Sequence, residues 1–231
     1  MTWLALLPWT DWLALAVFFT AWTVYAWFAQ RGHSSGTTLL ARTNRYRHYW
    51  LLQATWREPR MLDGIIVQNL SSTPSFFSST SIIIIGGLFA LLGVTERANE
   101  LVNELPFAQV TPLAVFDFKV LLLVAVFVYA FFRFTWAMRL NTFVALAIGS
   151  MPPSTDFIQG KFDREVHARR ASRLVGLAAE AFNSGLRAYY MSFAVIAWFF
   201  SSTAFMLGSL LVVGILYRRE FRSDVLDVLT E

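Results

Sequence analysis

Four long apolar stretches divide the chain, at about 12–29, 76–94, 113–135 and 189–217. A helix needs roughly 20 consecutive, mostly apolar residues to cross the hydrocarbon core of a membrane. Backbone exposed to lipid must satisfy its hydrogen bonds internally, which a helix does. The pattern therefore predicts an all-α fold, a polytopic membrane helical bundle of four transmembrane helices, in a single transmembrane domain over residues 1–231.

Two polar segments between the spans, 38–73 and 154–187, are amphipathic. The first mixes arginines with aromatic residues, most densely at 45–50. In the second, apolar residues recur at helical spacing between 166 and 182. Helices that combine basic and aromatic side chains are typical of the membrane interface. We therefore expect amphipathic cytoplasmic helices at the interface in both segments.

Basic residues concentrate after the first and third spans. Residues 30–73 contain six arginines against two acidic residues, and residues 141–187 contain six basic residues against four acidic ones. The segment between the second and third spans is acidic instead. Loops rich in Lys and Arg stay cytoplasmic, so four spans place both termini outside. Arg218, Arg219 and Arg222 oppose this orientation of the tail, which also contains four acidic residues.

The composition agrees with a membrane protein and excludes several kinds of chemistry. Hydrophobic residues make up 56% of the chain and charged residues only 15%, whereas a soluble domain carries roughly 25% charged residues. The absence of cysteine excludes disulfides, iron–sulfur clusters, thiolate zinc sites and a cysteine nucleophile. The formal net charge of +4 comes from residues that mostly flank the spans. It therefore favours a membrane topology over nucleic-acid binding.

Small residues recur along the predicted fourth span at spacings of three and four, which places them on one helical face. They are Ala194, Ala197, Ser201, Ala204 and Gly208. In lipid, helices associate where small residues let their backbones approach closely. This helix-packing seam is expected to face protein, either another span of the same chain or a second subunit.

Polar residues inside or beside the second and third spans are candidates for a transport path. They are three hydroxyl-bearing residues and three basic residues: Ser78, Ser79, Thr80, Lys119, Arg133 and Arg139. Charged residues within a membrane span often mark substrate or ion pathways. The alternatives are structural, because hydroxyls bond to the preceding turn or a neighbouring helix, and long basic side chains reach toward lipid headgroups.

Signals of catalysis are sparse. Residues 32–36 match the pattern Gly-x-Ser-x-Gly, but that nucleophile elbow requires a strand before it, and here an apolar span precedes it. His33, His48 and His167 lie outside the spans without the paired spacing of metal ligands. The sequence has no phosphate-binding P-loop and no dinucleotide fingerprint. We expect no enzyme activity, no catalytic residue, no cofactor and no metal site.

Six motifs, spread over nearly the whole chain, carry a family resemblance: 63–64, 75–80, 129–139, 148–152, 182–190 and 217–226. They resemble an uncharacterised family of bacterial membrane proteins, which has plant relatives and is known only as a domain of unknown function. The last motif is similar to gammaproteobacterial members. The resemblance implies a four-helix, multi-pass protein of the bacterial inner (plasma) membrane and implies no activity. Together with the charge pattern, it predicts that both termini are periplasmic.

The sequence favours a non-enzymatic integral membrane scaffold, self-associating or an accessory subunit of a larger membrane complex. The seam, the amphipathic segments and the lack of an acid–base pair inside the spans support this hypothesis. The alternative is a small oligomeric channel or carrier, lined by the hydroxyls and charges of the second and third spans. A lipid-modifying enzyme is a third hypothesis. Expected partners are membrane lipids, further copies of the chain or other membrane-protein subunits, and no nucleic acid.

Overall fold

The computed structural model describes residues 7–34, 36–104 and 111–229, and these residues form helices without any strand. The expected all-α fold is therefore confirmed for the described residues. The helices are α1 (Trp9–Ser34), α2 (Leu39–Ala54), α3 (Met61–Leu92), α4 (Thr95–Asn103), α5 (Leu113–Gly149), α6 (Ser154–Ile158), α7 (Arg164–Ala197), α8 (Ser202–Phe221) and α9 (Asp224–Val228).

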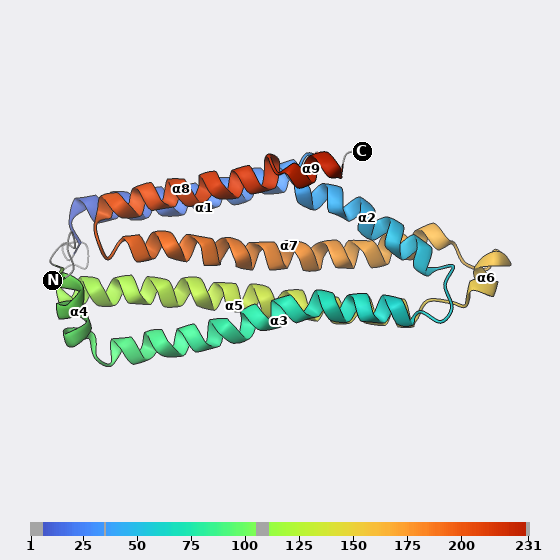
Figure 1. The fold of residues 1–231 in the computed structure, drawn as a ribbon, viewed down its shortest axis with the longest axis horizontal. Coiled ribbons are helices and arrows are strands. Elements are labelled where there is room, and N and C mark those ends of the chain that lie inside the picture. The colour runs from blue at the N-terminus through green and yellow to red at the C-terminus, as the bar shows by residue number, and fades with distance from the viewer. Residues whose placement is uncertain (1–6, 35, 105–110, 230–231) are drawn as a thin grey trace.

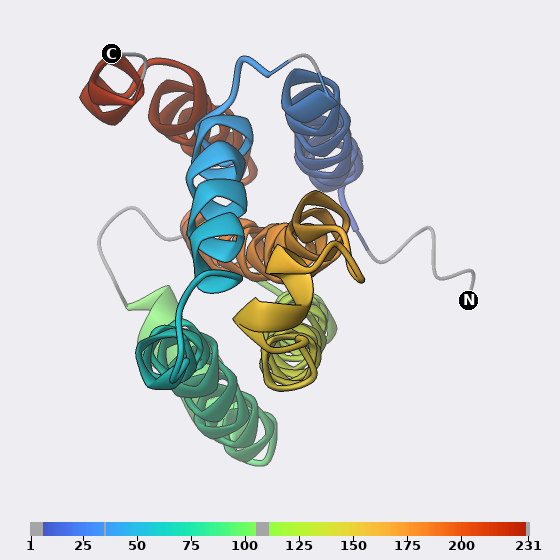
Figure 2. The same cartoon turned by 90° about the vertical axis from the view of Figure 1, so that its right-hand side faces the viewer.

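Five long helices, α1, α3, α5, α7 and α8, run along the long axis of the molecule (Figure 1). The short helices α4 and α6 lie at its two ends, which we call the α4 end and the α6 end. Seen from the α6 end, α7 lies at the centre, with α1 and α8 on one side and α5 and α3 on the other (Figure 2). α2 packs across α7.

Within the described residues, three helices are long and apolar enough to cross a membrane: α1 as far as Gly32, α3 and α5. They indicate a membrane protein. α5 has 37 residues, which corresponds to a length of about 55 Å at helical rise, whereas a hydrocarbon core is about 30 Å thick. The bundle is therefore longer than a membrane core, and part of it must project beyond the core if α5 crosses.

The predicted fourth span, 189–217, is not one helix. α7 ends at Ala197, the chain turns, and α8 begins at Ser202 and runs back along α7. Ser201 has extended backbone (φ −165°) and its hydroxyl accepts a hydrogen bond from the N–H of Ala204 at 3.0 Å. This is the N-cap geometry that starts a new helix. A hydropathy pattern does not detect the turn, because Trp198, Phe199 and Phe200 before the cap are as apolar as a span.

α1 and α8 run parallel to each other. Ser202 at the start of α8 bonds Asp11 at the start of α1, and the rings of Phe28 and Phe221 near their ends lie 5.1 Å apart. The start of α1 and the end of α8 therefore lie toward opposite ends of the bundle (Figure 1). The expectation that both termini share one side depended on a single fourth span, and the hairpin removes that basis.

Both amphipathic segments are helical, and each contains part of a long helix that continues into an apolar stretch. Segment 38–73 comprises α2 and the first part of α3, which continues through Pro74 into the apolar stretch. Segment 154–187 comprises α6 and most of α7. In α2 the residues Leu51 and Ala54 are fully buried, because this helix packs on α7 with its apolar side.

Candidate functional site

The small residues of the predicted seam are divided between two helices. Ala194 and Ala197 are in α7, Ser201 caps α8, and Ala204 and Gly208 are in α8. A Cβ on Gly208 would lie 3.5 Å from the Cα of Ala194 and 3.5 Å from the Cβ of Ala197. The turn therefore folds the small residues onto one another, and the close approach occurs inside the α7–α8 hairpin.

The hydroxyls of the second predicted span have different surroundings. Ser78 is buried, Ser79 is exposed, and Thr80 donates to the carbonyl of Phe76 at 2.9 Å. Ser81 is fully buried and lies 2.9 Å from the Tyr189 hydroxyl. Back-bonding and an interhelical bond account for Thr80 and Ser81.

The basic residues of α5 are also separated from one another. Arg133 donates to the Ser184 hydroxyl of α7 at 3.3 Å. Arg139 is exposed, with its guanidinium 5.7 Å from the ring centre of Phe143. Lys119 is 5% exposed, and its ammonium donates to the carbonyl of Trp198 at 2.9 Å. None of the six candidate path residues lines the cavity between the long helices or the second hollow beside Pro59 and Gly149.

A cluster at the α4 end joins three helices around Trp198, which is fully buried. The indole N–H donates to Asp11 Oδ1 at 2.8 Å, and the hydroxyl of Ser202 donates to the same oxygen. On the other side, Lys119 binds the carbonyl of Trp198. We call Asp11, Lys119, Trp198 and Ser202 the turn lock, because they tie α1 and α5 to the α7–α8 turn.

The turn lock places each charge where a helix terminus favours it. Lys119 binds the carbonyl of Trp198, directly after the last residue of α7. Asp11 accepts from Ser202, the first residue of α8. A cation is stabilised at a helix C-terminus and an anion at an N-terminus. The sequence pattern missed Asp11 and Trp198, because neither lies in a motif and they are 187 residues apart.

A second buried carboxylate lies near the α6 end. Asp63 of α3 is fully buried and accepts from the indole N–H of Trp50 in α2 at 2.8 Å. Arg57 forms an ion pair with the same oxygen, Oδ1, at 3.1 Å. The contact joins α2 to α3 across the loop that connects them. In the sequence, Asp63 stands out only as part of the motif 63–64, and an Asp-Gly pair does not indicate that the carboxylate is buried.

Two arginines, Arg60 and Arg164, connect the loops at the α6 end. Arg60 donates to the carbonyls of Ala54, Met151 and Pro152, at 3.1, 3.0 and 2.6 Å. Its atoms therefore bridge the α2–α3 loop and the chain that leaves α5. We call these residues, with Arg164 and its partners below, the loop clamp.

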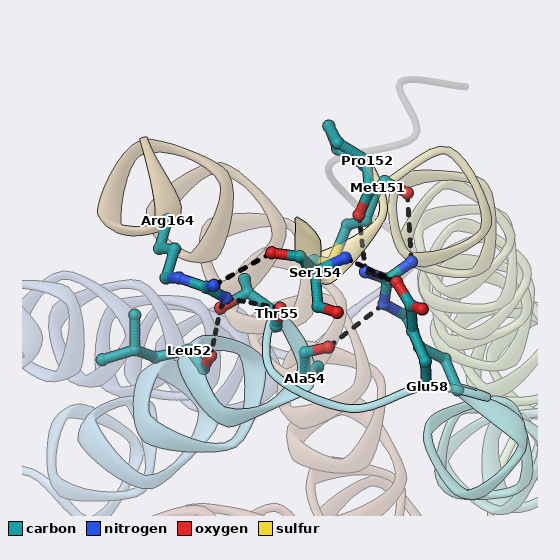
Figure 3. Close-up of polar contacts among 9 residues, drawn as sticks. Leu52, Ala54, Thr55, Glu58, Met151, Pro152, Ser154 and Arg164 are labelled. Carbon is teal, nitrogen blue, oxygen red and sulfur yellow. Dashed lines mark hydrogen bonds and ion pairs between the residues drawn. The ribbon is translucent and has the colours of Figure 1, made fainter. Parts of the chain in front are cut away.

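Arg164 completes the loop clamp from the start of α7. Its guanidinium donates to the carbonyl of Thr55 at 2.6 Å and to the carbonyl of Ser154 at 3.2 Å, and Figure 3 shows these bonds converging on it. It also stacks 3.5 Å from the ring centre of Trp56. These contacts occupy the carbonyl of Thr55, which caps the end of α2, and that of Ser154, the first residue of α6.

Asn141 of α5 repairs a defect in α3. Pro74 lies inside α3 and has no N–H to donate to the carbonyl four residues earlier, at Leu70. The Asn141 amide donates to that carbonyl at 3.2 Å. Asn141 is 4% exposed, so this bond also satisfies a buried polar side chain.

A cavity of about 360 Å³ lies where α1, α2, α3, α5, α7 and α8 meet. Its walls include three arginines and one acidic residue: Arg47, Arg187, Arg219 and Glu220. Among the described residues, no group of three or more His, Cys, Asp or Glu side chains could hold a metal ion. Ser35, part of the Gly-x-Ser-x-Gly pattern, lies outside the described residues.

Comparison with known proteins gives a family and no activity. The family model described as "Protein of unknown function, DUF599" matches residues 13–225, and the chain belongs to that family. This confirms the expected membership of an uncharacterised family. No curated protein and no solved structure matches the chain.

Proposed function

We propose that this DUF599 protein is a non-enzymatic integral membrane scaffold that holds further copies of itself or other membrane-protein subunits. One observation carries the proposal: the buried and half-buried charges at both ends bind the protein's own backbone or neighbouring side chains. In the turn lock, Lys119 binds a backbone carbonyl. In the loop clamp, Arg60 and Arg164 bind carbonyls at the α2–α3 and α5–α6 connections. Such groups fix helices in place, whereas a pathway needs charges that face a water-filled interior.

We propose five membrane crossings: α1, the second part of α3, the first part of α5, the second part of α7, and α8. The basic segments 30–73 and 141–187 then lie in the cytoplasm, at the α6 end. The end of α8, with Arg218, Arg219 and Arg222, joins them on that side. The arginines that opposed the four-span topology thus agree with the positive-inside rule, and a bacterial inner membrane suits this arrangement.

The docking surface of the scaffold is proposed to be the projecting α6 end. Arg170 and Arg173 are exposed on α7 there, and this half of α7 lies beyond the apolar stretch. Exposed arginines recognise carboxylates through two parallel hydrogen bonds. A partner with an acidic surface fits this end of the molecule.

Native mass measurement of the full-length protein, purified in mild detergent, tests the scaffold. We expect a complex of fixed stoichiometry, with itself or with a second membrane protein. The double variant Arg170→Glu/Arg173→Glu should dissociate it, because like charges then face each other. Arg97→Glu reverses the charge of an exposed residue on α4, at the opposite end of the molecule, and should leave the complex intact. A monomer without a stoichiometric partner would refute the proposal.

A carrier or channel is the second proposal, favoured by the burial of Lys119 within α5. An ionisable residue inside a span is a functional candidate by default. Liposomes containing the protein would then show ion flux that disappears in Lys119→Met. The scaffold account expects no flux with either protein.

A further inference from the structure

The cavity between α2, α7 and α8 has a composition that suits an anionic ligand. Its volume of about 360 Å³ falls in the range of small-molecule sites, about 300–1,000 Å³. Apolar residues such as Leu70, Phe182 and Leu186 share its walls with Asn69, Asn141 and Asn183. A cavity with apolar walls and a few converging polar groups is the usual form of a ligand site.

Three arginines from three helices reach this cavity, and neighbouring side chains hold them in position. Arg187 of α7 lies over the ring of Tyr25, 5.4 Å from its centre. Arg219 of α8 donates to the hydroxyl of Tyr190 at 2.6 Å. Both arginines are therefore preoriented by aromatic residues that line the same cavity. Glu220, the acidic residue of the lining, accepts from the backbone N–H of Leu40 at 3.5 Å.

Arg47 of α2 is the third arginine and lacks a carboxylate partner. Its guanidinium donates to the Asn44 side chain at 2.5 Å, and among the described residues it forms no ion pair within 4.0 Å. Burial lowers the pKa of Arg47 to about 10. A cation removed from water is costly unless an opposite charge accompanies it. The free protein thus leaves a partly buried positive charge for a ligand to neutralise.

The cavity also lies at the depth of lipid headgroups, if the proposed crossings are correct. About 20 residues of α1 cross the core before Arg31, so Tyr25 lies near the basic boundary of the membrane. Pro74 of α3 and Leu216 of α8 line the cavity from the apolar parts of their helices, and Arg47 lines it from α2, beyond α1. Basic pockets between membrane helices on the cytoplasmic side are suited to lipid headgroups.

We propose that this cavity binds the phosphate group of an anionic phospholipid, with Arg47, Arg187 and Arg219 around the phosphate and the apolar wall along the glycerol backbone. Guanidinium groups bind phosphate oxygens through paired, charge-assisted hydrogen bonds. The site goes beyond the scaffold proposal, because it does not require any protein partner. A bound lipid would join α2, α7 and α8, which meet at the cavity.

Lipid titration of the delipidated full-length protein in mild detergent tests the site. Thermal unfolding is followed with phosphatidylglycerol, with diacylglycerol, which lacks the phosphate, and with inorganic phosphate alone. We expect saturable stabilisation by phosphatidylglycerol and little by the other two. Arg47→Gln should weaken the binding of phosphatidylglycerol about tenfold or more. Without lipid, this variant should be at least as stable as the native protein, because a partly buried cation without a carboxylate partner is gone.

Two matched controls separate the cavity from general attraction to basic surface. Arg45→Gln removes an exposed arginine from the same helix and should retain binding. Ala179→Phe places a large side chain in the cavity without changing charge and should abolish binding. Leu177→Phe adds the same side chain at an exposed position of α7 and should not affect binding. If Ala179→Phe does not fold, Arg219→Gln replaces it, with the same expected loss.

Three results would overturn the proposal. The first is equal loss of binding in Arg45→Gln and Arg47→Gln, which would indicate surface electrostatics. The second is full binding in folded Ala179→Phe or Arg219→Gln. The third is stabilisation by inorganic phosphate that matches that of the lipid, which would make free phosphate the ligand and reject the lipid.

Discussion

At the α4 end of the bundle, Asp11 and Lys119 are each 5% exposed and bind the α7–α8 turn from two sides. At the α6 end, Arg60 and Arg164 hold carbonyls of the loops and are themselves less buried than Asp11 and Lys119. Opposite charges are nearby at the first end, and neutral carbonyls are the principal partners at the second. The turn lock should therefore cost more to break than the loop clamp, because removing one of its two charges leaves the other buried without an opposite charge nearby.

The largest effect is expected for Asp11→Leu in the turn lock. The Trp198 indole and the Ser202 hydroxyl lose their acceptor, and Lys119 loses the nearby opposite charge. Removing one member of a buried pair of opposite charges lowers the free energy of unfolding by about 3–5 kcal/mol. Reversible unfolding in detergent measures this loss. The double variant Asp11→Leu/Lys119→Met should regain part of this, because neither charge remains buried. Glu96→Leu, exposed at the same end, should change stability by less than about 0.5 kcal/mol.

Between the two ends, Asn141→Leu should give an intermediate loss. The carbonyl of Leu70 then has neither the Pro74 nitrogen nor the Asn141 amide as a donor, and an unsatisfied buried acceptor costs about 1–3 kcal/mol. Adding Pro74→Ala supplies an N–H within α3 and should recover most of the loss. Equal destabilisation in the single and double variants would mean that the Asn141 bond does not serve the proline defect.

Gly185→Ala should have a comparable or slightly smaller effect, for a steric reason. An added Cβ would lie 2.5 Å from Cε1 of Phe134, where α7 approaches α5. Overpacking a core contact costs about 1–3 kcal/mol. Gly87→Ala makes the same change within α3, where a Cβ has nothing within 4 Å, and should be neutral or stabilising. A thermal melt of both variants checks the difference.

The smallest effect is expected for Arg164→Gln in the loop clamp. The carbonyls of Thr55 and Ser154 lose charge-assisted donors. Glutamine keeps an amide donor that can serve one of them, and Ser154 is partly exposed, so the expected net cost is about 1 kcal/mol. Unfolding measured beside Asp11→Leu gives the comparison directly. A loss as large as that of Asp11→Leu would show that the two ends do not differ as described.

The helices were predicted correctly where a long apolar run alone decides the structure. The stretches at 12–29, 76–94 and 113–135 lie in three helices that could cross a membrane, because long apolar runs have few other arrangements. The prediction of a single span at 189–217 was wrong, because Trp198, Phe199 and Phe200 form a turn that is as apolar as the helices beside it. The run Ser201-Ser202-Thr203 was the available signal, since hydroxyl residues favour the N-cap.

The polar contacts could be predicted much less well than the helices. The sequence identifies Lys119 as a candidate residue but does not predict its partner. The carbonyl of Trp198 can accept from Lys119 only because α7 ends there and the chain turns. Asn141 and Pro74 were both visible, yet their bond depends on the register between α3 and α5. Sequence patterns report local periodicity, whereas these contacts depend on which helices pack together.

Because the α7–α8 hairpin decides on which side of the membrane the C-terminal segment lies, cysteine labelling in whole cells can test it. The chain has no cysteine, so single substitutions at the exposed positions Gln53, Glu100 and Val225 each report one location. A membrane-impermeant maleimide should label Glu100→Cys in intact cells. Gln53→Cys and Val225→Cys should react only after permeabilisation, because both lie on the basic side. Labelling of Val225→Cys together with Glu100→Cys, while Gln53→Cys stays protected, would contradict the hairpin and restore a single fourth span.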